Sequence, residues 1–104
     1  MLTEKQKEKL KANWGAKADA MECKAEARIY DPLSPWCCYI YAMNPSNEDE
    51  IATITKGFGI EVGEWTMKEL EAMFNAEGEK PVVDTEFRPR LASDIYKRMT
   101  EGNL

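Results

Sequence analysis

Histidine is absent from this 104-residue chain, and its absence removes several classes of enzyme from consideration. Without an imidazole there can be no Ser-His-Asp or Cys-His nucleophile pair, no HExxH zinc site and no imidazole acid–base chemistry. Long apolar runs are also missing, and no stretch approaches the roughly 20 residues of a membrane span. The charged residues that follow Met1 do not resemble a signal peptide. We therefore expect a cytoplasmic protein that does not contact membranes.

Cysteine is scarce, with Cys23, Cys37 and Cys38 as its three representatives. The neighbours Cys37 and Cys38 would point to opposite faces of a strand, so they cannot readily bind one metal ion together. An odd number of cysteines does not make a disulfide framework. We interpret all three as reduced, small apolar side chains rather than as a disulfide, a zinc site or a redox pair.

The composition is that of a folded domain, because 43% of the residues are apolar and 10% are aromatic. A chain of this length buries about 65% of its unfolded surface, which is sufficient for one hydrophobic core. No repeat, low-complexity tract or linker divides the sequence. We expect a single α+β domain over residues 1–104.

The hydrophobic pattern predicts about four strands. Residues 23–30 alternate between apolar and polar, whereas 36–43 form the most continuous apolar stretch, typical of a central strand. The β-branched residues at 51–55 and the segment 60–65 should follow as the third and fourth strands. Short connections favour an antiparallel meander. The acidic run Glu48-Asp49-Glu50 should then lie at a hairpin tip, after the turn at 44–47.

Three helices are expected to pack on this sheet. Thr3 can cap a first helix that runs to about Trp14, and Thr66 with Glu69 forms a capping box for a middle helix that Gly78 ends. A short extended segment at 81–83 precedes the last helix, which reaches about Thr100. The apolar stripes of the last two helices are Met67, Leu70, Met73 and Phe74, and Leu91, Ile95 and Met99.

Charge is unevenly distributed along the chain, whose net charge is −5. Residues 31–87 carry a net −9, and the segments 1–30 and 88–104 each carry a net +2. This acidic excess can serve solubility alone, or it can attract a partner with a basic surface. Aromatic residues dominate binding hot spots when they are exposed. The candidate partner-binding residues are therefore Glu48, Asp49, Glu50, Glu61, Glu64, Trp36 and Trp65.

Other groups of residues give weaker indications of a metal, phosphate or catalytic site. The run 48–50 does not fit an EF-hand loop, and Gly57-Phe58-Gly59 lacks the spacing of a phosphate-binding loop, so we interpret these glycines as providing turn flexibility. Glu61 and Glu64 could act as paired carboxylates only if the fold brought them together. The basic segment Arg88-Pro89-Arg90 either binds a carboxylate or phosphate group or simply precedes the last helix.

Several short motifs recur in an order that resembles a known family. They are Ala27-Arg-Ile-Tyr-Asp-Pro32, Trp36, the acidic turn after Asn44-Pro45, Gly-x-Gly at 57–59, Glu61-Val-Gly63, Thr66-Met-Lys-Glu-Leu-Glu71 and Phe87-Arg-Pro89. Together they resemble a family of small bacterial proteins of unknown function carried on plasmids, integrative elements and phages. The resemblance implies a mobile-element context, in which small acidic proteins, anti-CRISPR inhibitors among them, block host defences.

These observations together favour a non-enzymatic binding protein without a cofactor, which engages a basic protein surface and could be an anti-CRISPR inhibitor. One alternative is a plasmid or phage accessory protein that touches nucleic acid through its lysine-rich first helix and Arg88 and Arg90. The acidic net charge makes nucleic acid an unlikely partner. A second alternative is a hydrolase that uses carboxylates and Mg²⁺.

Overall fold

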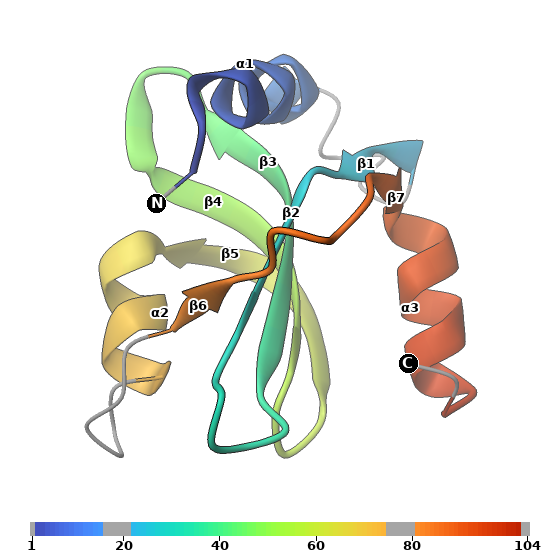
Figure 1. Ribbon diagram of the computed structural model, residues 1–104. Helices are drawn as coiled ribbons and strands as arrows, with labels where there is room; N and C mark the ends of the chain where they lie inside the picture. Colours follow the sequence, from blue (N-terminus) through green and yellow to red (C-terminus); the bar gives the residue numbers. More distant parts are fainter. Residues whose placement is uncertain (1, 16–21, 75–80, 103–104) are drawn as a thin grey trace.

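A five-stranded antiparallel sheet forms the centre of the computed structural model, which describes residues 2–15, 22–74 and 81–102. The strand order is β5-β4-β3-β2-β6 (Figure 1). Its members are β2 (Ala27–Tyr30), β3 (Cys37–Asn44), β4 (Asn47–Lys56), β5 (Ile60–Thr66) and β6 (Val82–Val83). The predicted α+β class and the meander are confirmed, and so is the central position in the sheet of the segment 36–43, which forms β3. The segment predicted to be extended at 81–83 adds a fifth strand beside β2.

The single strand predicted at 23–30 is instead two strands. A two-stranded sheet joins β1 (Lys24–Ala25) to β7 (Arg90–Leu91), while β2 joins the main sheet. The division falls at Glu26, whose side chain is buried and lies 3.7 Å from the ammonium group of Lys9. The prediction was wrong here because the partner of β1 lies more than 60 residues further along the chain.

Residues 48–50 lie within β4 and not at a hairpin tip, which corrects the prediction. The turn itself is tight, since Asn44 pairs with Asn47 across it. The side-chain oxygen of Asn44 accepts a hydrogen bond from the Ser46 N–H at 2.9 Å, and that of Asn47 accepts one from the Asp49 N–H at 3.1 Å. Asparagine side chains thus satisfy the turn locally, and strand pairing resumes sooner than the charge run suggested.

Two of the three helices begin with a capping box: the one predicted at Thr66 is confirmed, and the predicted cap Thr3 also forms one, with Gln6. In α1 (Glu4–Asn13), the Gln6 N–H donates to the Thr3 hydroxyl at 3.1 Å, and the Thr3 N–H donates to the Gln6 side chain at 2.9 Å. In α2 (Met67–Phe74), Thr66 and Glu69 make the equivalent pair of bonds at 3.0 and 3.1 Å. The predicted helix end at Gly78 and the side chains of residues 73 and 74 lie outside what the structure describes. None of the described helices is long and apolar enough to cross a membrane.

The last helix, α3 (Ala92–Thr100), differs slightly from its predicted stripe. Ile95 and Met99 are buried as expected, together with Ala92. Leu91, predicted as the first member, belongs to β7 and is 42% exposed. The predicted apolar stripe began one residue before the helix itself, because the backbone of Leu91 is still extended.

Both faces of the main sheet are covered. Along β4, Ile51 belongs to a core cluster with Leu10 of α1 and Leu70 of α2, whereas Ala52 belongs to a second cluster with Ile95 of α3. Figure 1 shows α2 and α3 on opposite sides of the sheet. Burying a leucine or isoleucine side chain fully is worth about 1.5–3 kcal/mol, so these helices are held mainly by a few large residues. We call the two sides the α2 face and the α3 face.

The three cysteines are reduced and buried, as predicted. Cys37 belongs to the cluster on the α3 face and Cys38 to the cluster on the α2 face, so the neighbours do point in opposite directions.

Candidate functional site

A pocket of about 220 Å³ opens on the α2 face, near the end of the sheet where two hairpin loops meet. It brings together three of the residues that the sequence singled out, Trp36, Glu61 and Trp65. The other residues that line it are Thr55, Gly57, Phe58 and Gly59. A cavity of about 150 Å³ can hold a benzene molecule, so this pocket can hold one side chain of moderate size. We call it the aromatic pocket.

The loop between β2 and β3 places Trp36. Asp31 is buried and organises this loop: its carboxylate accepts hydrogen bonds from the Leu33 N–H and from the Ser34 hydroxyl, both at 2.9 Å. The Asp31 N–H donates to the Trp36 carbonyl at 3.1 Å, and the Trp36 N–H donates to the Ser34 hydroxyl oxygen at 3.3 Å. These bonds fix the backbone on both sides of the indole.

The second loop, between β4 and β5, supplies a glycine on which this indole rests. A Cβ atom added to Gly57 would lie only 2.2 Å from Cζ3 of Trp36. Glycine is therefore required at position 57 for close approach and not for turn flexibility, since Gly102 is the only described glycine with positive φ. The ring of Phe58, which is fully exposed, meets the Trp36 ring edge-on with a centroid distance of 5.5 Å.

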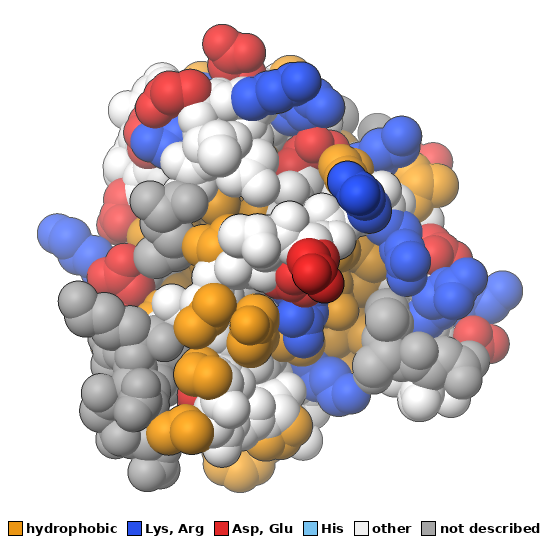
Figure 2. Space-filling view, viewed as in Figure 1, with side chains coloured by type: hydrophobic (Ala, Val, Ile, Leu, Met, Phe, Trp, Pro, Cys, Tyr) orange, Lys and Arg blue, Asp and Glu red, His pale blue; other side chains and the backbone are white. Residues whose placement is uncertain are grey.

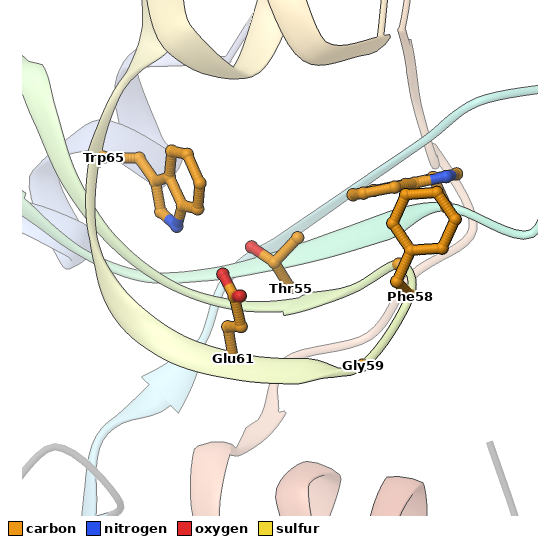
Figure 3. Close-up of a pocket in the computed structure, with 7 residues that line it drawn as sticks. Thr55, Phe58, Gly59, Glu61 and Trp65 are labelled. Carbon is orange, nitrogen blue, oxygen red and sulfur yellow. The ribbon is translucent and has the colours of Figure 1, made fainter.

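Glu61 brings the pocket its charge. Figure 3 shows its carboxylate pointing into the space between Trp65 and Phe58, with Thr55 behind it. Within the described part of the chain the Glu61 side chain makes no hydrogen bond or ion pair. Glu61 is the only ionisable residue that lines the pocket among the described residues, so the pocket carries one unpaired negative charge against aromatic walls.

The strand register separates Glu61 from Glu64. Glu61 is paired with Thr55, and Glu64 with Ala52, so their side chains extend from opposite faces of β5. Consistent with this, the charge of Glu64 contributes to raising the pKa of Tyr41 on the α3 face, where burial is the larger cause. The two carboxylates therefore do not form the paired site that was considered.

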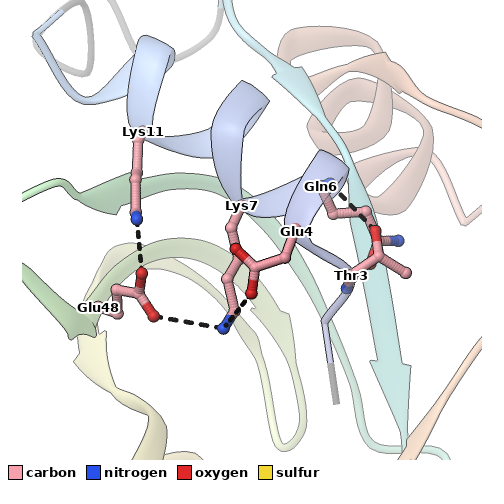
Figure 4. Close-up of polar contacts among 6 residues, drawn as sticks. All are labelled: Thr3, Glu4, Gln6, Lys7, Lys11 and Glu48. Atoms are coloured by element: carbon pink, nitrogen blue, oxygen red, sulfur yellow. Dashed lines mark hydrogen bonds and ion pairs between the residues drawn. The ribbon is translucent and has the colours of Figure 1, made fainter.

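The acidic run 48–50 lies apart from the pocket and has partners within the protein. Glu48 accepts a hydrogen bond from Lys11 and is paired with Lys7 at 3.3 Å (Figure 4). Hydrogen bonding from Lys11, and then from Lys7, holds the pKa of Glu48 below its usual value. Glu50 accepts a hydrogen bond from the Asn44 amide at 2.9 Å, and Asp49 is half-buried beside the same turn. In this arrangement Glu48 and Glu50 bind α1 and the hairpin turn.

The lysine-helix part of the nucleic-acid alternative and the metal-dependent alternative find little support in the described residues, whereas Arg88 and Arg90 are exposed. Three of the four α1 lysines that would touch nucleic acid are engaged within the protein, since Lys9 lies 3.7 Å from Glu26 and both Lys7 and Lys11 are paired with Glu48. No three Asp, Glu or Cys side chains gather there as metal ligands would. Cys38, which pairs with the pocket residue Thr55, is a poor nucleophile because burial raises the pKa of its thiol to about 12.

Sequence reasoning missed Phe58 and Asp31. An aromatic residue between two glycines, as in Gly57-Phe58-Gly59, is a signal that could have found the first, because a hairpin end exposes its middle residue. Asp31 followed by a proline indicated only a break in the strand, and nothing local revealed that its carboxylate shapes the Trp36 loop.

The chain matches no protein-family model, and no curated protein or solved structure is significantly similar to it. Its function must therefore be argued from the geometry of the site.

Proposed function

We propose that this protein is a non-enzymatic binding protein, and that the aromatic pocket takes up an arginine or lysine side chain from a basic surface of a partner protein. The observation that carries this proposal is the unpaired Glu61 carboxylate between Trp65 and Phe58. The faces of aromatic rings attract cations, and a carboxylate adds a direct ionic contact.

The chemistry of the pocket favours a cationic side chain over other occupants. A purely apolar group would bury the Glu61 charge without a partner, which is costly. A hard cation such as Ca²⁺ takes six to eight oxygen ligands, and the pocket offers one carboxylate and the hydroxyl of Thr55, which already shares a hydrogen bond with Thr53 at 3.0 Å.

The surroundings of the pocket suit a protein partner. Phe58 is fully exposed and Leu33 is 67% exposed, and both lie in the loops at the same end of the sheet. Figure 2 shows apolar side chains gathered around β6 and towards this end of the molecule. An exposed apolar surface beside a charged anchor point is typical of a binding interface.

We further propose the mobile-element setting that the resemblance of the sequence motifs implies. A protein from a mobile element that works in the cytoplasm would meet nucleic-acid-binding host proteins, whose grooves expose arginine and lysine. A CRISPR effector is one such partner, and an inhibitor of it would need a rigid surface and no catalytic group.

The test is a titration with a short arginine-containing peptide and with the same peptide carrying the neutral isostere citrulline. One cation–π contact is worth about 0.5–2 kcal/mol and an exposed ion pair up to about 1 kcal/mol, so we expect a Kd of about 10 mM or weaker, which NMR can still measure. Glu61→Gln should weaken binding of the arginine peptide about 1.5- to 5-fold, while Glu64→Gln, on the same strand but the opposite face, should not. Equal binding of both peptides, or equal effects of the two substitutions, would contradict the proposal.

A further inference from the structure

A second pocket, on the α3 face, collects most of the arginine in the chain. The sequence has four arginines, and three of them, Arg28, Arg88 and Arg90, line one pocket of about 390 Å³. Among the described residues no lysine lines it, although lysine is the commoner basic residue in the chain. Figure 2 shows basic side chains along the side of the molecule formed by β1, β7 and α3. We call this the arginine pocket.

Arg28 forms a fixed wall of the arginine pocket. Its guanidinium lies 3.2 Å from the Asp84 carboxylate and stacks over the rings of Tyr30 and Tyr39 at 4.9 and 5.8 Å. Burial lowers the pKa of Arg28, but its interactions with Tyr39 and Asp84 outweigh burial, so the pKa is raised overall and the group stays charged. Asp84 therefore already has a cationic partner.

Arg88 and Arg90 are the groups available to a ligand. Both are exposed, and neither guanidinium forms a hydrogen bond or ion pair with any described residue. Both side chains line the same pocket, so they lie on the same side of this segment. The charge of Arg90 also reaches Tyr39, where it opposes the rise in pKa that burial causes.

The backbone that carries these two arginines is anchored at both ends. Before them, the Asp84 N–H donates to the Arg28 carbonyl at 2.8 Å, and the Phe87 ring packs on Tyr39 with a centroid distance of 5.6 Å. At the other end, Arg90 itself pairs with Ala25 of β1. A ligand that binds here would not have to order this segment, which favours affinity.

We propose that the arginine pocket binds a phosphate group, held by the guanidinium groups of Arg88 and Arg90. Arginine presents a planar fork of donors that matches phosphate and carboxylate oxygens. One such fork satisfies a carboxylate, whereas two unpaired forks on the same side suit the three oxygens of a phosphate monoester. Glu86 lines the same pocket and should oppose the anion.

The experiment titrates the full chain with inorganic phosphate at constant ionic strength, followed by ¹H–¹⁵N NMR, with acetate as the carboxylate probe. Arg88→Gln and Arg90→Gln should each weaken phosphate binding about tenfold, and Glu86→Gln should tighten it about two- to threefold. Arg98→Gln is the matched control, because this fourth arginine is paired with Asp94 at 3.1 Å and does not line the pocket.

Parallel titrations with a sugar phosphate and a nucleoside monophosphate would show which kind of phosphate ester the pocket prefers. Saturable phosphate binding with the stated pattern of variants would support the proposal. The proposal would be overturned by the absence of saturable binding, by equal affinity for acetate, or by an equal loss in Arg98→Gln. All substituted side chains are exposed, so thermal unfolding should show each variant folded like the wild type.

Discussion

Substitution of Gly57 by alanine tests whether the Trp36 indole is held where the structure places it. The new Cβ would lie 2.2, 2.3 and 2.5 Å from Cζ3, Cη2 and Cε3 of Trp36. Carbon atoms pack best at about 3.5–4.0 Å, so the ring must withdraw by more than about 1 Å. Overpacking of this kind costs about 1–3 kcal/mol. Displacing the ring should also weaken arginine-peptide binding about 2- to 30-fold, the range expected for a lost cation–π contact.

Gly59→Ala is the matched control in the same loop. A Cβ at Gly59 meets no atom within 4 Å and its φ is not positive, so this substitution should be neutral or stabilise by up to about 1 kcal/mol. Urea unfolding monitored by far-ultraviolet circular dichroism measures both free energies, and the peptide titration measures both affinities. If Gly57→Ala proved as stable as Gly59→Ala and bound the peptide equally well, the close packing of Trp36 on Gly57 would be refuted.

Three further predictions concern the scaffold. Glu48→Gln should lower the urea midpoint at pH 7. The difference in midpoint between wild type and variant should vanish as the pH falls below about 4, because a carboxylate with a lowered pKa stabilises the fold only while it is ionised. A difference that persisted at low pH would contradict the ion pairs with α1. Thr66→Ala should cost about 0.5–2 kcal/mol by removing the α2 cap, measured by thermal unfolding, and an unchanged Tm would argue against the capping box. Cys38 should resist iodoacetamide at pH 8 until urea unfolds the chain, because about one thiol in ten thousand is ionised at that pH. Mass spectrometry locates the label, and rapid labelling of Cys38 in the native protein would show that this thiol is not buried.

Features that depend on neighbouring residues could be predicted from the sequence. The capping boxes at Thr3 and Thr66 involve residues three positions apart, and the continuous apolar run at 36–43 indicated a central strand without knowledge of its partners. Features that depend on pairing between strands far apart in the sequence could not be predicted. The division of 23–30 at Glu26 requires β7, and β6 joins the sheet only because Asp84 and its neighbours run beside β2.

The candidate site shows the same limit. Trp36, Glu61 and Trp65 were selected by residue type, and strand parity alone shows that Glu61 and Glu64 face opposite ways once both are placed on one strand. That Trp36, Glu61 and Trp65 meet Phe58 in one pocket depends on two loops that are adjacent only in the folded sheet. The sequence also could not show that Glu48 binds lysines of α1, because the pairs are separated by about 40 residues.

The most direct test of the aromatic pocket is to follow the three indole N–H signals by ¹H–¹⁵N NMR while the arginine peptide is added. Trp36 and Trp65 line the pocket, whereas Trp14 packs against the core cluster of the α3 face and serves as an internal control. We predict saturable shifts of the Trp36 and Trp65 signals, a stationary Trp14 signal, and no shifts with the citrulline peptide. Stationary Trp36 and Trp65 signals, or shifts of all three indoles together, would contradict the proposed function.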